Sequence, residues 1–286
     1  SGRVSSNITF ASPVLTCDGE LFYRDTNGDY WRGQSYIPHT NMRVVVSDKH
    51  AYQVGRVLAA FHSFVADLDI DQLQDPLPDF HNLDHYLAEF DYEWSLQKPS
   101  NDTSAIDYCH SRIQAYRKLA STFTEAKSTG IVELQAIHGD PKVDNFLFDE
   151  NGQAFGLLDL DTVGSGLSLI DLGDCLRSCC NTAGESGLGR VRFDQEICKA
   201  ILQGYFSWSD NCFSKEQFSL IYEAVLLISF ELGLRFFTDY LRGNVYFRVT
   251  REDGNLLKAV GQFQLADDIK RQETGLRAFS NSLKER

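Results

Sequence analysis

The residues best suited to chemistry lie in two short polar segments, residues 138–145 and 159–161, which have apolar runs on either side. The first segment reads His-Gly-Asp-Pro-Lys-Val-Asp-Asn, and the second begins with Asp159. Charged groups beside apolar flanks are costly unless they hold something, typically a metal ion or a phosphate. These two segments are therefore the candidate reaction centre.

The order and spacing of the side chains in these segments fit phosphoryl transfer. Asn145 lies five residues after Asp140, and Asp159 follows beyond a predicted hairpin. A hydroxyl that attacks a γ-phosphate needs a carboxylate to accept its proton, and the Mg²⁺ that bridges the phosphates needs oxygen ligands. These three residues supply both, with the Asp-to-Asn separation found in protein kinases. Lys142 is placed to neutralise charge on the transferring phosphate.

A hairpin is expected to bring the two polar segments together. Residues 146–148 and 154–158 read as strands around a turn at residues 149–152. The two ends of such a hairpin lie side by side, which places Asn145 near Asp159. The polar cluster thus enters the hairpin, and the second segment leaves it.

The rest of the chain changes from strand to helix patterns. Residues 8–37 read as strands, with Asn27-Gly28 as a hairpin turn, and residues 38–41 break the pattern. From Ser47, a plausible N-cap, apolar residues recur at helical spacing. The predicted helices cover residues 47–65, 83–96, about 104–123, a segment opened by Asp171 and Asp174, and then 193–208, 215–241 and 255–283.

The composition of the chain disfavours some classes of binding partner. The 286 residues, 43% of them hydrophobic, can form a large core in one large domain or two smaller ones. An excess of 40 acidic over 27 basic residues gives a formal charge of −13, which disfavours nucleic acid and anionic membranes as partners. We find no run of about 18 apolar residues that would indicate a membrane span, and no secretory signal.

The cysteines and two histidines offer weaker candidates for metal sites. Seven cysteines, with Cys179 and Cys180 adjacent, do not suit a disulfide framework and favour a reducing, cytoplasmic setting. Cys175 and Cys179 lie one helical turn apart, but no His is close to them, so core packing is favoured over a metal. His81 and His85 lack the Glu of a zinc-protease motif, so we expect surface or capping histidines.

The catalytic pattern, from His138 through Asn145 to Asp159, resembles the aminoglycoside phosphotransferase / choline kinase family. Further segments resemble its N-acetylhexosamine 1-kinase branch. These segments are residues 30–32, 159–162, 171–178 and 237–247, which together span most of the chain.

The resemblance implies catalytic and metal-binding roles for residues of the polar cluster. Asp140 would be the catalytic base and Lys142 a phosphate contact, while Asn145 and Asp159 would bind Mg²⁺. His138 and Asp171 would support the catalytic loop, with Asp171 accepting backbone N–H bonds; a plain N-cap is the compatible alternative for Asp171. ATP would be the phosphate donor.

The resemblance also implies where substrate and adenine bind. Arg235 and Tyr246 match sugar-binding positions, since a guanidinium offers forked donors and an aromatic ring a flat face. A salt bridge and a core aromatic are the alternatives. Asp161 would be a ligand of the substrate or of a second metal ion. A structural hydrogen-bond acceptor is the alternative, and it is the one that we favour. Adenine would bind against backbone groups of a hinge that includes Tyr36 and Ile37.

The fold implied is α+β: a protein-kinase-like two-lobed fold with a partial β-rich small lobe over residues 1–41 and a mostly helical large lobe over 42–286. We find no Gly-rich loop and no Val-Ala-x-Lys strand ahead of Tyr36. The chain is then either a fragment that lacks its first segment or a natural departure from the family. The complete catalytic set favours a fragment.

Several functions stay open from sequence. The first is phosphorylation of a sugar hydroxyl, with the anomeric hydroxyl of an N-acetylhexosamine as its more specific form; the runner-up is an aminoglycoside-, choline- or homoserine-type substrate. Arg235 would oppose a cationic substrate. A non-catalytic module that keeps the kinase fold is the third. A Ca²⁺ loop is disfavoured because His138, Lys142 and Val143 interrupt the necessary carboxylate spacing. The sequence does not indicate an oligomeric state.

Overall fold

The computed structural model combines short strands with a mostly helical body. It describes residues 8–40, 44–45, 47–74, 76–96, 104–184, 191–208 and 213–285. None of the helices in these residues is long and apolar enough to span a bilayer.

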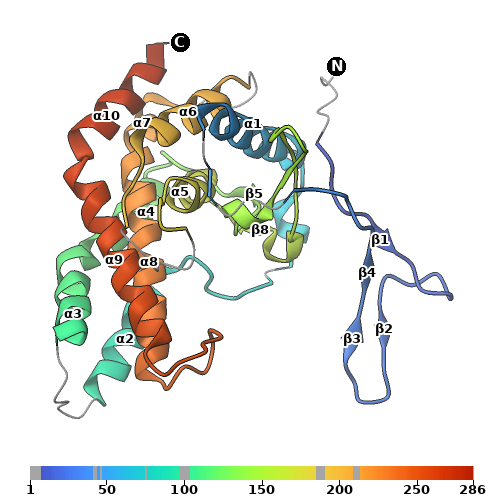
Figure 1. Cartoon of the computed structure of the whole chain (residues 1–286), viewed down its shortest axis with the longest axis horizontal. Helices are drawn as coiled ribbons and strands as arrows, with labels where there is room; N and C mark the ends of the chain where they lie inside the picture. Colours follow the sequence, from blue (N-terminus) through green and yellow to red (C-terminus); the bar gives the residue numbers. More distant parts are fainter. Residues whose placement is uncertain are drawn as a thin grey trace.

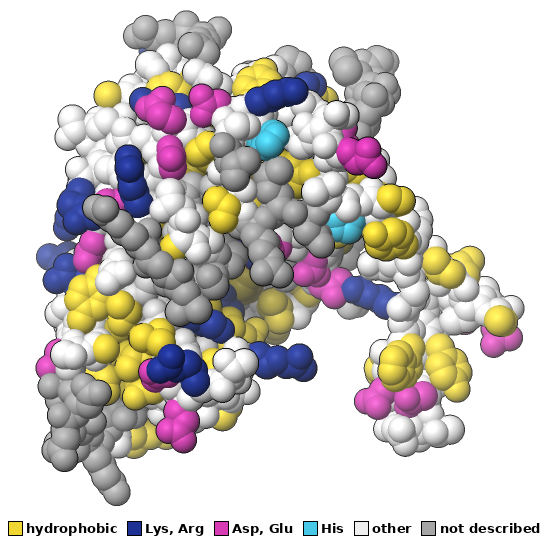
Figure 2. All heavy atoms as spheres, viewed as in Figure 1, with side chains coloured by type: hydrophobic (Ala, Val, Ile, Leu, Met, Phe, Trp, Pro, Cys, Tyr) yellow, Lys and Arg dark blue, Asp and Glu magenta, His cyan; other side chains and the backbone are white. Residues whose placement is uncertain are grey.

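The first described residues form an arm of four two-residue strands, which projects from the body (Figure 1). β1 (Pro13–Val14) pairs antiparallel with β4 (Gly33–Gln34), and β2 (Tyr23–Arg24) with β3 (Tyr30–Trp31). The predicted turn at Gly28 is confirmed, with a φ of 91° that suits glycine. Hydrophobic side chains are exposed along the arm (Figure 2).

The two ends of the arm flank a second hairpin in the body. Thr9 forms a bridge with Gly156 on one side of that hairpin, and Thr40 with Phe148 on the other. Phe10 also packs against Phe61, with ring centroids 6.0 Å apart. Backbone pairing and an aromatic contact therefore attach the arm to the body.

This second hairpin is the one expected from sequence. β6 (Phe146–Phe148) pairs antiparallel with β7 (Ala154–Leu157), with Phe146 opposite Leu157. A further antiparallel pair, β5 (Gln135–Ile137) and β8 (Gly164–Gly166), lies on either side of it in the chain. The polar segments thus leave β5 and enter β8, with the β6–β7 hairpin between them.

The helical body packs around these strands (Figure 1). Ser47 caps α1 (Asp48–Val65) as expected, because its hydroxyl accepts the His50 N–H at 3.3 Å. α1 packs on α6 (Gln195–Phe206) at a glycine crossing: a Cβ added to Gly55 would lie 2.0 Å from the Ile201 carbonyl oxygen. Close approach of these two backbones therefore requires the glycine.

A layer of longer helices completes the body. α5 (Ser168–Cys179) packs on α8 (Ile221–Leu241), and α8 packs on α2 (Leu83–Ser95) and α9 (Gly254–Arg271). The remaining helices are α3 (Ser104–Tyr116), α4 (Ala120–Ser128), α7 (Lys215–Ser219) and α10 (Glu273–Ser282).

Three helices expected to be continuous are interrupted. A 3₁₀ turn, Arg117–Leu119, separates α3 from α4, Leu220 separates α7 from α8, and Gln272 separates α9 from α10. The flanking helices still turn apolar side chains toward one core, so the apolar periodicity does not show the breaks. The cysteines at positions 109, 175, 179, 180 and 198 are free and buried in this core. Within the described ranges no three His, Cys, Asp or Glu side chains gather as a metal site.

Candidate active site

The loop after β5, residues 138–145, is the candidate catalytic loop. One buried carboxylate holds its first two residues. Asp171 on α5 accepts the backbone N–H of His138 at 2.9 Å and that of Gly139 at 2.8 Å. Gly139 has a φ of 87°, and a Cβ there would lie 2.5 Å from the Thr162 carbonyl oxygen. Only glycine fits this turn, which aims the following residue, Asp140, away from the core.

Asp171 is itself held by a buried histidine that the sequence analysis missed. The Nε2–H of His62 on α1 donates to Asp171 Oδ2 at 2.8 Å, and His62 Nδ1 lies 2.7 Å from the hydroxyl of Tyr205. Burial alone would raise the pKa of Asp171, but the hydrogen bond and charge of His62, with the His138 contacts, lower it. The only signal in sequence was a histidine within the apolar face of the predicted helix.

His138 connects the catalytic loop to the strand that leads to Asp159. Its Nε2 donates to the Leu158 carbonyl at 2.9 Å, and its Nδ1 accepts the Asp140 backbone N–H at 3.3 Å. This pattern of one donor and one acceptor corresponds to a neutral imidazole. The ring is fully buried, so it fixes the two polar segments relative to one another.

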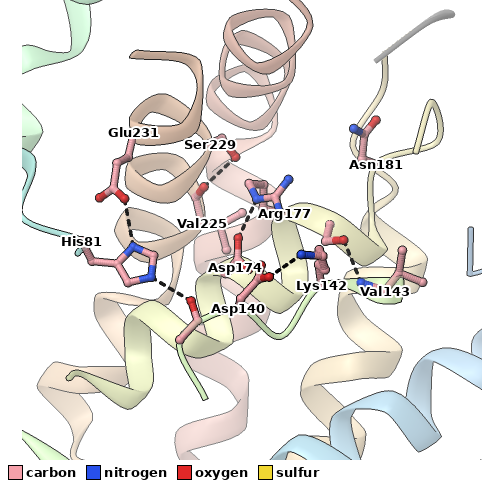
Figure 3. Close-up of polar contacts among 12 residues, drawn as sticks. His81, Asp140, Lys142, Val143, Asp174, Arg177, Asn181, Val225, Ser229 and Glu231 are labelled. Atoms are coloured by element: carbon pink, nitrogen blue, oxygen red, sulfur yellow. Dashed lines mark hydrogen bonds and ion pairs between the residues drawn. The ribbon is translucent and has the colours of Figure 1, made fainter. Parts of the chain in front are cut away.

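Asp140, Lys142 and Asn145 lie together at the surface end of the loop. Lys142 forms an ion pair with the Asp140 carboxylate, and the two side chains point toward each other (Figure 3). The side-chain amide of Asn145 donates to the Asp140 carbonyl at 2.8 Å, while Asn145 itself is buried. The Asp140 side chain is 27% exposed, so its carboxylate is accessible from solvent.

The hairpin brings Asp159 beside Asn145. The Leu158 N–H donates to the Asn145 carbonyl at 2.8 Å, one residue before Asp159. Asp159 is exposed and has a φ of 59°, a left-handed conformation that is uncommon outside glycine. Such backbone strain clusters at functional sites.

Asp161 faces the arm. Its carboxylate forms an ion pair with Arg32, and both side chains are about half exposed. The hydrogen bond to Asp161 is the main cause that raises the pKa of Arg32. Asp161 therefore connects the catalytic segment to the residue that follows β3.

The two hinge residues lie outside the strands. Tyr36 is 80% exposed, and the expected extension of the strand over residues 35–37 does not form. The Ile37 carbonyl accepts from His39 Nδ1 at 2.7 Å. The exposed ring of Tyr36 lies 6.2 Å from the His39 ring, between centroids.

Arg235 and Tyr246 both line a cavity of about 250 Å³ between α2 and α8. The guanidinium carbon of Arg235 lies 6.0 Å from the ring centroid of Tyr246, and 5.0 to 5.5 Å from those of Phe80, Tyr86 and Phe247. Cation–π attraction of this kind orients a guanidinium without using its hydrogen-bond donors. We call this cavity the Arg235 pocket.

The wall of this pocket is organised by Asp239, to which the sequence analysis gave no role. Its carboxylate accepts the backbone N–H groups of Val245, Tyr246 and Phe247 at 2.9 to 3.0 Å. The side chain of Asn255 donates to it as well, at 2.8 Å. The short aromatic turn that carries Tyr246 is therefore fixed by one buried carboxylate.

His81 differs from expectation. It is neither a surface nor a capping residue: Asn82 caps α2, and His81 is part-buried between Glu231 and the Gly139 carbonyl. Its φ of 58° places it before the helix, so the spacing to His85 is not a helical repeat.

Comparison with known proteins assigns the chain to a family. The profile of the phosphotransferase enzyme family (APH) matches residues 11–207, more than half of the chain. Among solved structures, an aminoglycoside phosphotransferase from Alicyclobacillus acidocaldarius superposes with a TM-score of 0.62 at 16% identity, over 97% of this chain and 78% of that one. A choline kinase from Cryptosporidium parvum gives 0.58 at 12%, over 96% and 77%.

A third structure contains ligands. The amicoumacin kinase hAmiN, in complex with AMP-PNP, Ca²⁺ and Ami, gives a TM-score of 0.51 at 12% identity, over 90% of this chain and 72% of that one. At such identities the likeness shows the shared fold, which is protein-kinase-like with few short strands and a helical body. The chain thus belongs to the phosphotransferase enzyme family and is a small-molecule kinase of the aminoglycoside phosphotransferase and choline kinase type.

Proposed function

We propose that this kinase transfers the γ-phosphate of ATP to a hydroxyl of a neutral sugar, and that the anomeric hydroxyl of an N-acetylhexosamine is the first acceptor to test. The observation that carries the sugar assignment is the state of Arg235. Its guanidinium rests over four aromatic rings and has no hydrogen bond or ion pair within the described residues. Its forked donors are therefore available to acceptor oxygens.

The acidic residues around this pocket support a neutral rather than a cationic substrate. Glu89 and Asp239 are the carboxylates among its lining residues. Glu89 forms an ion pair with Arg242 at 2.9 Å, and the Asp239 carboxylate accepts hydrogen bonds from backbone N–H groups. An aminoglycoside or choline-like cation would find Arg235 and no free carboxylate. Sugar hydroxyls would instead bind the guanidinium, and the sugar face would pack on a ring such as Tyr246.

The catalytic loop supplies the groups for the transfer. Asp140 accepts the proton of the attacking hydroxyl, and Lys142, now paired with Asp140, contacts the transferring phosphate. Asn145 and Asp159 fit a Mg²⁺ site, because Asn145 Oδ1 has no partner in the described part of the chain and Asp159 is exposed. Bound Mg²⁺ would neutralise charge on the phosphates. AMP-PNP and Ca²⁺ in the amicoumacin kinase complex support a nucleotide and a divalent ion.

Two further assignments complete the proposal. Residues 1–41 would belong to the nucleotide-side lobe and 42–286 to the substrate-side lobe, with adenine against the backbone at Tyr36 and Ile37. Ile37 keeps a backbone N–H without a partner in the described residues, which suits this role. Asp161 we assign to the ion pair with Arg32 that fixes the arm, rather than to the substrate.

The test is a kinase assay with MgATP and a panel of N-acetylhexosamines, hexoses, aminoglycosides, choline and homoserine, with ³¹P NMR to identify the phosphorylated hydroxyl. We expect turnover with a neutral sugar, and loss of turnover in Asp140→Asn. Faster turnover of a cationic acceptor would overturn the sugar assignment. ATP binding in a thermal-shift assay without turnover of any acceptor would favour a non-catalytic binding module.

A separate measurement tests the division of roles within the loop. Asp159→Ala should weaken binding of Mg-nucleotide, because a metal ligand is lost, whereas Asp140→Ala should leave this binding largely intact. Calorimetric titration with Mg-AMP-PNP compares the two variants. Equal loss of nucleotide affinity in both would contradict the assignment.

A further inference from the structure

His81 lies in the segment between α1 and α2 and bonds to two other elements at once (Figure 3). Its Nδ1 is 2.9 Å from Oε1 of Glu231 on α8, and its Nε2 is 3.0 Å from the carbonyl oxygen of Gly139 in the catalytic loop. A carboxylate and a peptide carbonyl only accept hydrogen bonds, so both ring nitrogens carry a hydrogen. His81 is therefore an imidazolium in this arrangement.

The charged groups around His81 favour this form. Burial alone would lower the pKa of His81, but Glu231 and, from α5, Asp174 raise it to about 9. Oε2 of Glu231 is buried and has no hydrogen-bond partner among the described atoms, so His81 is the direct counter-charge of this carboxylate. Asp174 is also paired with Arg177, at 2.7 Å.

Three other charged groups lie on the neighbouring elements. Arg235 is one turn along α8 from Glu231, and the Asp140–Lys142 ion pair follows Gly139 in the catalytic loop. The φ of His81 is 58°, a strained value that its contacts must maintain. The position of the imidazolium is therefore determined by Glu231 on one side and the catalytic loop on the other.

We propose that His81 is a positioning residue for phosphoryl transfer: it ties the Gly139 carbonyl to α8, and thereby sets the place of the Asp140 carboxylate that follows. This inference rests on the proposed role of Asp140. Asp171 already holds the N–H of Gly139, so the loop is fixed at both faces of this residue. Loss of His81 would leave the Asp171 contact, so the loop stays folded while Asp140 shifts.

The same segment reaches the Arg235 pocket. Phe80, next to His81, lies under the Arg235 guanidinium at 5.2 Å, and Arg235 and Glu231 are four residues apart on one face of α8. Residues 80 and 81 thus touch the substrate pocket and the catalytic loop respectively. A substrate that moves Arg235 would also affect the hydrogen bond between His81 and Gly139, which positions Asp140.

The first test measures kcat and KM of wild type, His81→Ala and His81→Gln with MgATP and N-acetylglucosamine or N-acetylgalactosamine. We expect kcat of His81→Ala to fall about tenfold to hundredfold, as small misplacements of a reacting group do. The KM for MgATP should change less than twofold, and His81→Gln, which keeps one donor, should be intermediate. His110→Ala, a histidine on α3 stacked on Trp94, is the matched control. A kcat of His81→Ala within twofold of wild type would overturn the proposal.

The second test uses an isosteric variant that keeps the hydrogen bond but removes the charge. In Glu231→Gln, the pKa of His81 should fall from about 9 toward its ordinary value of 6.5. Because a hydrogen bond from an imidazolium is stronger than one from a neutral ring, the ratio of kcat in this variant to kcat in wild type should be near one at pH 6 and decline toward pH 8.5. A merely structural role predicts a constant ratio, and that result would contradict us.

A third readout does not depend on turnover. In protein labelled with ¹⁵N in the histidine rings, His81 should show two protonated ring nitrogens at pH 7.5, with His81→Ala providing the assignment. If wild type phosphorylates no acceptor, the proposed function fails while this signature persists. A His81 ring without a hydrogen on Nε2 at pH 7.5 could not donate to the Gly139 carbonyl, and this result would refute the positioning role whatever the substrate is.

Discussion

At the catalytic loop, two consecutive backbone N–H groups donate to the buried Asp171, and a neutral His138 and a charged His81 hold the same turn from other sides. At the Arg235 pocket, the guanidinium has no hydrogen bond within the described residues and rests on aromatic faces. The first region has its backbone groups paired within the protein, whereas the guanidinium of the second has donors without partners in the described residues.

This difference agrees with the roles proposed for the two regions. A proton acceptor and metal ligands contribute most when they are held in place before the substrate arrives. A recognition group must form new hydrogen bonds on binding, so its donors cannot be committed in the free protein. Variants in the first region should therefore change kcat or stability, and variants in the second should change the KM for the acceptor.

The largest effect on activity is expected for Asp140→Ala. Loss of the proton acceptor should lower kcat by about 10²- to 10⁴-fold, the range for general base catalysis. Circular dichroism and thermal unfolding should match wild type, because the Asp140 side chain is part-exposed at the end of the loop. Asp144→Ala, an exposed carboxylate in the same loop, is the matched control and should keep its activity. Equal losses in both variants would show that the loop, rather than the base, was damaged.

Asp171→Ala should have the largest effect on stability. It leaves His62 and two backbone N–H groups unpaired in the core, and breaking a buried pair costs about 3–5 kcal/mol. Asp171→Asn keeps one acceptor oxygen and should lose less. Urea unfolding monitored by fluorescence measures both.

The stability lost on substitution of Asp171 should depend on pH in one direction. Because the folded pKa of Asp171 is below its ordinary value of 3.8, the ionised carboxylate stabilises the fold above that pH. The stabilisation disappears as the pH falls through the lowered folded value. The gap between wild type and Asp171→Asn should thus narrow in acid, and a gap that widens there would contradict the assignment.

The sequence was informative where chemistry is local. A hairpin with an obvious turn predicted the β6–β7 pair and the closeness of Asn145 to Asp159, and the residue before Asp159 donates its N–H to the Asn145 carbonyl. Both features depend on residues within twenty positions of each other, so pattern and strand geometry suffice.

The missed residues act across long separations. His62 is 109 positions from Asp171, and His81 is 150 positions from Glu231. Nothing in periodicity reports such partners: the helical pattern gave His62 no role, and His81 was predicted to be a surface or capping histidine. The arm shows the opposite error: residues 8–15 are apolar enough for a strand, but only Pro13 and Val14 form a strand pair there, and Thr9 forms a single bridge to the body. Strand length is set by pairing as much as by composition.

Arg235→Ala tests the recognition side of the comparison. The KM for the acceptor should rise about tenfold to hundredfold, since hydrogen bonds from a charged donor contribute about 1.5–3 kcal/mol. The KM for MgATP should be unchanged. Arg235→Lys should recover only part, because an ammonium lacks the planar fork. Arg248→Ala, exposed and outside the pocket lining, is the control. A fall in kcat at constant KM would place Arg235 with the catalytic region instead.

Asp161 lies between the two kinds of region, and it gives the smallest expected effect. If it only fixes the arm through Arg32, a double-mutant cycle of Asp161→Asn and Arg32→Gln should yield a coupling below about 1 kcal/mol, because both side chains are half exposed and screened by water. The KM for the acceptor should stay within about threefold of wild type, a free-energy change below the contribution of one charged hydrogen bond. A KM increase as large as that of Arg235→Ala, with no coupling to Arg32, would instead make Asp161 a substrate ligand. The recognition region would then reach from the Arg235 pocket to the catalytic segment itself.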